Sequence, residues 1–167
     1  MKLHCHYLFP WDKNDFKIFE YFHEMYKMSQ YIGGYADDEY INCTPKDQFV
    51  TRFQLMHYPL GGGHIQVHQH PGDAFKVTTI STLSVKGKDY QTGGVYFLNE
   101  NGEKVHLDEH LDFGDVVVSY AGLVHGVDAV DPHKKLDWKT IDGRWTLLFG
   151  NVVSDQWLDG QKKSKDG

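Results

Sequence analysis

The chain has 167 residues, a formal net charge of -6 and 40% hydrophobic residues. This length and apolar fraction predict one globular domain over residues 1–167 with a substantial core, and they exclude a disordered chain. The negative charge leaves no basic face of the kind that phosphate binding needs. We therefore expect neither DNA nor RNA as a partner.

Cysteine usage and hydropathy favour a reducing compartment. The two cysteines, Cys5 and Cys43, lie outside any CxxC pair, which excludes a disulfide framework and a zinc ribbon. The N-terminus lacks an apolar run of signal-peptide length, and no segment approaches the apolar length of a membrane helix. We expect a soluble, cytoplasmic protein that does not bind membranes.

One helix is predicted at about residues 12–32, because Phe16, Phe19 and later apolar residues recur every three to four positions. Short β-rich runs separated by Gly, Pro, Asn and Asp follow over about residues 48–155. The polar tail 159–167 is expected to fray. Several short strands behind one helix predict a mainly β fold, an antiparallel sandwich or barrel with the N-terminal helix packed outside. The expected strands are QFVTRFQLMHY, HIQVHQH, FKVTTISTLSV, GGVYFLN, GEKVHLD, DVVVSYAG and RWTLLFGNVV.

The stretch GGGHIQVHQH puts three histidines into seven positions directly after three glycines. A strand here would turn alternate residues to one face, namely His64, Gln66, His68 and His70. The apolar Ile65 would then point to the opposite face. The polar row faces either solvent, as on an edge strand, or a cavity.

A second segment, residues 114–127, favours the cavity. In GDVVVSYAGLVHGV a glycine turn feeds a buried strand, a bend of small residues follows, and His125 comes just after it. Such a strand can bring a third imidazole to two others. Neutral imidazole is a common ligand for iron, zinc, copper and nickel, so the two segments together predict a metal site.

A series of short motifs follows in order from about Arg52 to Phe149. They are Tyr58-Pro59, Gly61 to Gly63, His68-Gln69-His70, VTTISTL, Gly93-Gly94, Gly114-Asp115, His125-Gly126-Val127 and Gly143-Arg144-Trp145. This order and spacing resembles that of the Fe(II)/2-oxoglutarate-dependent oxygenases, in particular their prolyl-hydroxylase-like branch. The resemblance implies a double-stranded β-helix, the jelly-roll or cupin-like barrel.

The resemblance also implies roles for individual residues. His68 and His125 would bind iron, and Arg144 would hold the distal carboxylate of 2-oxoglutarate. A guanidinium suits that role because it offers a carboxylate two parallel donors and keeps its charge. The cosubstrate pocket is expected to be lined by Arg144, Thr146, Tyr58 and Thr82.

One position departs from the family pattern, because His70 stands where the family has an aspartate. Three explanations are open. His70 is itself the third ligand, Asp73 reaches in from the following turn, or the position provides no ligand, as in related halogenases. We favour His70, since it lies two residues beyond His68 and so on the same strand face.

The function implied by the resemblance is hydroxylation of a small molecule or peptide side chain, with Fe(II) as cofactor, 2-oxoglutarate as cosubstrate, O2 as oxidant and a ferryl intermediate. A cupin-type dioxygenase in which His68, His70 and His125 hold the metal without 2-oxoglutarate is the first alternative. A non-catalytic metal-binding jelly-roll module is the second. Arg144 separates the first two, because only the 2-oxoglutarate enzyme needs its buried charge.

Three further residues are expected to line a substrate pocket. His64 and Gln66 share the predicted face of His68, and Trp138 lies in a long insertion between His125 and Arg144 that is a candidate lid. The chain is short for this class of enzyme. A partner subunit, in the simplest case a second copy in a homo-oligomer, is therefore a candidate to complete the pocket.

Overall fold

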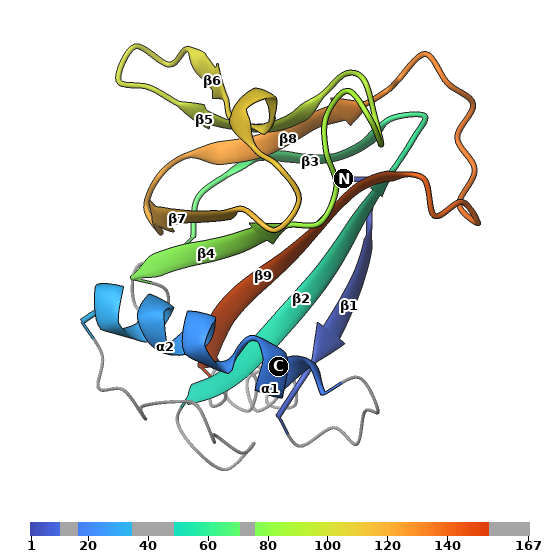
Figure 1. Cartoon of the computed structure of the whole chain (residues 1–167). Coiled ribbons are helices and arrows are strands. Elements are labelled where there is room, and N and C mark those ends of the chain that lie inside the picture. The colour runs from blue at the N-terminus through green and yellow to red at the C-terminus, as the bar shows by residue number, and fades with distance from the viewer. Residues whose placement is uncertain (11–16, 35–48, 71–75, 154–167) are drawn as a thin grey trace, which may run out of the picture.

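The computed structural model describes residues 1–10, 17–34, 49–70 and 76–153. This part of the chain holds nine β-strands and two short α-helices, arranged as two facing sheets with the helices on one outer side (Figure 1). The prediction of a mainly β fold with the helical segment outside is confirmed.

Every strand pair within the two sheets is antiparallel. The larger sheet has five strands in the order β1 (His4–Leu8), β2 (Phe49–Pro59), β9 (Gly143–Val153), β4 (Val77–Thr82) and β7 (Val116–Tyr120). The smaller sheet has four strands in the order β3 (Gly63–His68), β8 (His125–Val130), β5 (Gly94–Leu98) and β6 (Lys104–His106).

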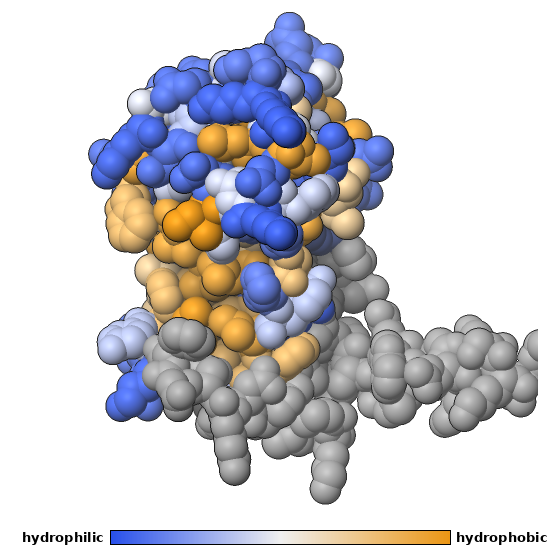
Figure 2. All heavy atoms as spheres, turned by 90° about the vertical axis from the view of Figure 1, so that its right-hand side faces the viewer, coloured by the Kyte–Doolittle hydropathy of each residue, from blue (hydrophilic) through white to orange (hydrophobic). Residues whose placement is uncertain are grey.

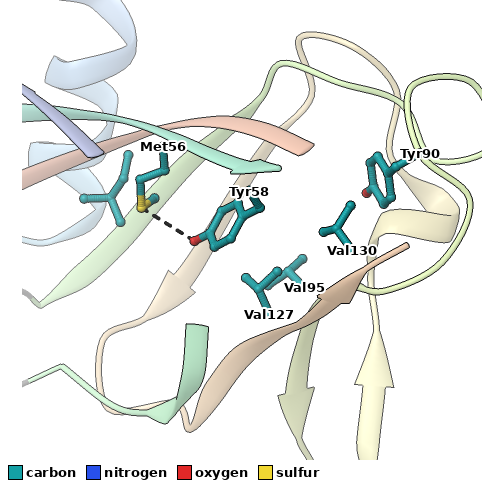
Figure 3. Packing of buried hydrophobic residues seen from close by; sticks show 7 residues of the cluster. Met56, Tyr58, Tyr90, Val95, Val127 and Val130 are labelled. Atoms are coloured by element: carbon teal, nitrogen blue, oxygen red, sulfur yellow. Dashed lines mark hydrogen bonds between the residues drawn. The ribbon is translucent and has the colours of Figure 1, made fainter. Parts of the chain in front are cut away.

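The long central strands β2 and β9 are covered on both faces, and alternation of side chains along them explains why. On β2, Met56 and Tyr58 point toward the smaller sheet, where they join a core with Val95, Val127 and other apolar residues (Figure 3). Phe53, three residues before Met56, points to the opposite face and packs under the helices. These strands are therefore rich in apolar residues at both odd and even positions.

The helices α1 (Ile18–Tyr21) and α2 (His23–Ile32) cover the outer face of the larger sheet (Figure 1). The single helix predicted at about 12–32 is thus interrupted at Phe22, and its first residues lie outside the described part. Buried hydrogen bonds fix α2 in place: the Tyr26 hydroxyl donates to Asn151 Oδ1 at 2.5 Å, and Ser29 Oγ lies 2.7 Å from Thr79 Oγ1. None of the helices described is long and apolar enough to span a membrane.

Two strands were not foreseen from the sequence. β1 lies before the helices and pairs with β2, with His4 opposite His57. β8 begins at His125, a residue that the sequence placed only after a bend. β8 lies between β3 and β5, so His125 stands at the end of an inner strand of the smaller sheet.

Candidate metal centre

Three histidines converge at one end of the smaller sheet. His68 is the last residue of β3, His125 is the first of β8, and the two are cross-strand partners. His70 follows β3 closely, where its backbone N–H donates to the carbonyl of Ala121 at 3.1 Å. One ring nitrogen from each of the three lies within 4.8 Å of the others, a group of donors that could hold a metal ion.

Backbone carbonyls orient two of these rings. Nδ1 of His68 lies 2.8 Å from the carbonyl of Gln66, and Nδ1 of His125 lies 2.8 Å from the carbonyl of Leu123. A carbonyl can only accept, so Nδ1 must carry the hydrogen and Nε2 keeps its lone pair. Fixing a ligating imidazole through its second nitrogen is the usual way in which proteins orient it toward a metal.

Burial favours the neutral form of two of these rings, those of His70 and His125. Burial, with the nearby His125 and His68, lowers the pKa of His70 to about 4. Burial also lowers the pKa of His125, against the opposing effect of its bond to Leu123. Neutral imidazoles are the form that binds a metal, and three of them suit iron and other first-row transition metals. The donor set therefore fits Fe(II), with no carboxylate among the described residues of the cluster. Asp73, the alternative third ligand, lies outside the described residues.

A β-bulge changes which residues of β3 face inward. Ile65 pairs with Val127 and His68 pairs with His125, so a step of three residues on β3 matches a step of two on β8. As a result Ile65 and His68 line the same cavity, and the predicted strict alternation of this strand is wrong. Gln66 is exposed instead.

The cavity lies between the sheets and has a volume of about 80 Å³. The smaller sheet contributes the histidines, and the larger sheet contributes Arg144 and Thr146 from β9 and Tyr58 from β2. The residues that line it are Gln54, Met56, Tyr58, Ile65, His68, His70, Ile80, Val95, His125, Val127, Arg144, Thr146 and Leu148. Most of the wall surface is apolar, although seven of the thirteen residues carry a polar group, and these groups come from both sides of the cavity.

Arg144 is fully buried, and Asp108 occupies one of the two edges through which its guanidinium can bind a carboxylate. Its Nε donates to Asp108 Oδ2 at 2.6 Å and its Nη2 donates to Asp108 Oδ1 at 2.9 Å. Burial would raise the pKa of Asp108, but its bonds with Arg144 hold the pKa below the ordinary value. The same bonds raise the pKa of Arg144 in spite of burial. Both groups are therefore charged at neutral pH.

Asp108 is the functional candidate that the sequence did not reveal. It lies in η1 (Asp108–His110), shortly after β6, and is 36 positions before its partner. The Tyr90 hydroxyl and the Val95 N–H also donate to its Oδ2, at 2.6 and 2.9 Å. A Cβ on Gly94 would collide with the same carboxylate, so glycine is required there. Gly94 belongs to the Gly93-Gly94 motif, which is the sequence feature that comes nearest to indicating the position of Asp108.

Two other predicted cosubstrate residues line the cavity. Thr146 is 1% exposed, and its hydroxyl has no hydrogen-bond partner in the described part of the chain. The Tyr58 hydroxyl donates to the sulfur of Met56 at 3.6 Å, a weak acceptor, and burial raises the pKa of Tyr58 to about 12 (Figure 3). Thr82 is buried opposite Thr146 on β4 but does not line the cavity.

The three residues expected in a substrate pocket lie elsewhere. Gln66 is exposed. His64 places its Nδ1 3.0 Å from the carbonyl of Gly62 and forms a backbone bridge with Lys2. Trp138 is 47% exposed and packs edge-on against His4 at 5.2 Å between ring centroids. None of them lines the cavity between the sheets.

A larger depression lies away from the histidines. It has a volume of about 420 Å³ and is lined by His6, Leu8, Ile18, Tyr21, Leu55 and Trp145. Figure 2 shows the side of the molecule on which β1 forms the sheet edge, with hydrophobic residues gathered across its middle and hydrophilic residues above. Among the described residues, the group of side chains that could hold a metal ion lines the smaller cavity and not this depression.

The arrangement of sheets is similar to that of a Pseudomonas putida prolyl-4-hydroxylase, with a TM-score of 0.58 and 16% identity over 89% of this chain and 67% of that chain. The fold is a double-stranded β-helix. The predicted jelly-roll class is therefore confirmed, including the helical segment outside it.

Two further structural matches are weaker. A full-length Neurospora crassa protein in complex with alpha-KG gives a TM-score of 0.49 at 13% identity, over 89% of this chain and 54% of that one. JOX2 in complex with 2OG, Fe and JA gives 0.49 at 14% identity, over 90% and 49%. The chain thus spans about half the length of these two structures. No family model and no curated protein matches the sequence.

Proposed function

We propose that the protein is an Fe(II)-dependent oxygenase that uses a 2-oxo acid of the 2-oxoglutarate type as cosubstrate, with hydroxylation of a small molecule or peptide side chain as the reaction. The observation that carries the proposal is the convergence of His68, His70 and His125 on a buried cavity whose opposite wall holds Arg144 and Thr146.

The imidazoles would hold the metal through lone pairs that the protein keeps available. The carbonyls of Gln66 and Leu123 hold the rings of His68 and His125 with Nε2 unprotonated. Burial disfavours protonation of His70, so protons compete weakly with the ion at neutral pH. Bound iron would supply the redox chemistry that activates O2.

The remaining wall would orient the cosubstrate and exclude water. Thr146 offers a buried hydroxyl without a partner in the described part of the chain, which a ligand oxygen can satisfy. Arg144 adds a fixed positive charge next to that hydroxyl on the same strand face. The apolar side chains between these groups and the histidines keep the cavity dry, which strengthens the electrostatic contacts within it.

The pairing of Arg144 with Asp108 favours a second candidate function. Because Asp108 binds one edge of Arg144 and offsets its charge, the site also suits a cupin-type three-His dioxygenase that needs no 2-oxo acid. A non-catalytic module that uses the metal only for stability is the remaining alternative. In that case metal removal lowers stability and no turnover is lost.

Anaerobic titration of the Fe(II)-loaded protein with saturating 2-oxoglutarate tests the proposal. We expect a weak visible charge-transfer band, because the C1 carboxylate and keto oxygen chelate iron when three imidazoles occupy only one face of it. Absence of the band, in protein that is folded and retains its iron, would overturn the 2-oxo acid proposal and favour the cupin-type enzyme.

Thr146→Val is the matched variant for this titration. It removes the hydroxyl and keeps the shape of the side chain, so we expect 2-oxoglutarate binding to weaken by about threefold to tenfold, the effect of one hydrogen bond. The free energy of unfolding without ligand should be no lower than in wild type, since the hydroxyl has no partner in the described structure. Unchanged ligand affinity would remove Thr146 from the cosubstrate site.

A further inference from the structure

The buried ion pair of Arg144 and Asp108 bears on which 2-oxo acid the cavity takes, an inference that rests on the proposed function. The two side chains are 4% and 3% exposed. Asp108 binds the fork formed by Nε and Nη2 of Arg144, which is one of the two edges that can hold a carboxylate through two parallel bonds, the other being the Nη1/Nη2 edge. A ligand carboxylate can reach Arg144 only beside this contact or by displacing it.

Asp108 is held firmly enough that displacement is unfavourable. Besides the two bonds from Arg144, its Oδ2 accepts from the Tyr90 hydroxyl and the Val95 N–H. The turn at Gly94, with φ of 112°, brings the backbone close against the carboxylate. The pair forms within one chain, so a free ligand competes with a partner that is already positioned.

The distribution of charge differs from that of a site with a carboxylate at the metal. In a site with a carboxylate at the metal, that carboxylate offsets part of the metal's positive charge. The arginine then remains free to bind an anionic ligand. Here the three candidate ligands are imidazoles, which bring no negative charge to the metal, and the buried carboxylate lies at Arg144 instead. The positive charge that an anionic ligand can neutralise is therefore concentrated at the metal, and the arginine end is nearly neutral overall.

The rest of the cavity is small and apolar. Its volume of about 80 Å³ lies far below the roughly 300–1,000 Å³ of pockets for drug-sized ligands. Between the histidines and Arg144 the wall consists mainly of Met56, Ile65, Ile80, Val95, Val127 and Leu148. These six side chains stabilise methylene and methyl groups and offer a second carboxylate no hydrogen-bond donor; apart from Arg144, the donors near that end are the neutral groups of Thr146, Tyr58 and Gln54.

We infer that the cavity accepts short 2-oxo acids with a single carboxylate and an apolar tail as readily as 2-oxoglutarate, and that Asp108 is the residue that determines this specificity. The carboxylate and keto group of such an acid lie at the histidine end. The tail extends along the apolar wall toward Thr146 and Arg144.

Anaerobic calorimetry on the Fe(II)-loaded protein tests this with two probes of equal chain length, 2-oxoglutarate and 2-oxopentanoate, which differ only in the second carboxylate. In wild type we expect the affinity for 2-oxoglutarate to exceed that for 2-oxopentanoate by less than about tenfold. An arginine without Asp108 beside it would favour 2-oxoglutarate by about 10- to 150-fold. A preference above tenfold overturns the inference.

Asp108→Asn frees the charge of Arg144 and keeps an acceptor for Tyr90 and Val95. It should shift the ratio of the two dissociation constants by at least about tenfold toward 2-oxoglutarate; a smaller shift in folded protein overturns the role of Asp108. Tyr90→Phe, which removes one bond and leaves the charge, should keep the wild-type ratio. If the asparagine variant does not fold, the wild-type ratio alone decides.

Failure of the proposed function gives a different result. If neither probe binds to folded, iron-loaded wild type, no 2-oxo acid is used and the proposed function falls together with this inference. If both bind but 2-oxoglutarate is strongly preferred, the proposed function stands and only the inference is overturned.

Discussion

Arg144→Met is expected to lower the free energy of unfolding by about 3–5 kcal/mol, as removal of one partner from a buried ion pair commonly does. The loss arises because Asp108, 3% exposed at its side chain, keeps its charge and loses two hydrogen bonds. Methionine fills much of the volume of arginine, so a cavity contributes little. Equilibrium unfolding in urea at pH 7, with the slope compared between variants, measures the effect.

The double variant Arg144→Met/Asp108→Asn is the control for this prediction. Asparagine removes the uncompensated charge and still accepts from Tyr90 and Val95, so the second substitution should recover a substantial part of the lost stability. A single variant within about 1 kcal/mol of wild type, or a double variant less stable than the single one, contradicts the buried pair as described.

His125→Ala is expected to weaken Fe(II) binding by more than about 100-fold, because loss of a ligand exceeds the 10- to 100-fold effect of losing a residue that only orients one. His125 is the buried member of the three and the first residue of β8. Anaerobic isothermal titration with Fe(II) measures the affinity, and circular dichroism checks that the variant is folded.

His64→Ala provides a matched control for the metal titration. His64 lies on the same strand as His68 and places Nδ1 near the carbonyl two residues earlier, as His68 and His125 do. It does not line the cavity, so its removal should leave the affinity within about twofold of wild type. Equal losses in the two variants would show that the site is not the one formed by His68, His70 and His125.

Much of the fold could be predicted from periodicity and turn residues. The central strands β2 and β9 have apolar residues on both faces, and the helical segment has apolar residues every three to four positions, so both were recognisable. β1 (HCHYL) and β8 (HGVDAV) were missed because polar residues or glycine interrupt their apolar residues, so neither forms a continuous β-rich run. Their strand conformation depends on pairing with distant neighbours, which local propensity does not reveal.

The site could be predicted in part. The order of motifs placed His68, His125 and Arg144 in one cavity, where the structure has them. The prediction of which β3 residues face inward was wrong. The bulge depends on the register with β8, and it cannot be recognised from the alternation of polar and apolar residues. Asp108 was missed for a similar reason, since its burial against Arg144 depends on packing between elements far apart in the chain.

X-ray absorption of the Fe(II)-loaded protein tests the convergence of three imidazoles on a single ion most directly, because the multiple scattering of imidazole rings reports how many are bound. We predict one iron per chain with three imidazole ligands and the remaining positions filled by oxygen donors from solvent. Two imidazoles with a carboxylate, the result expected if Asp73 were the third ligand, or fewer than two imidazoles, would contradict the three-histidine centre.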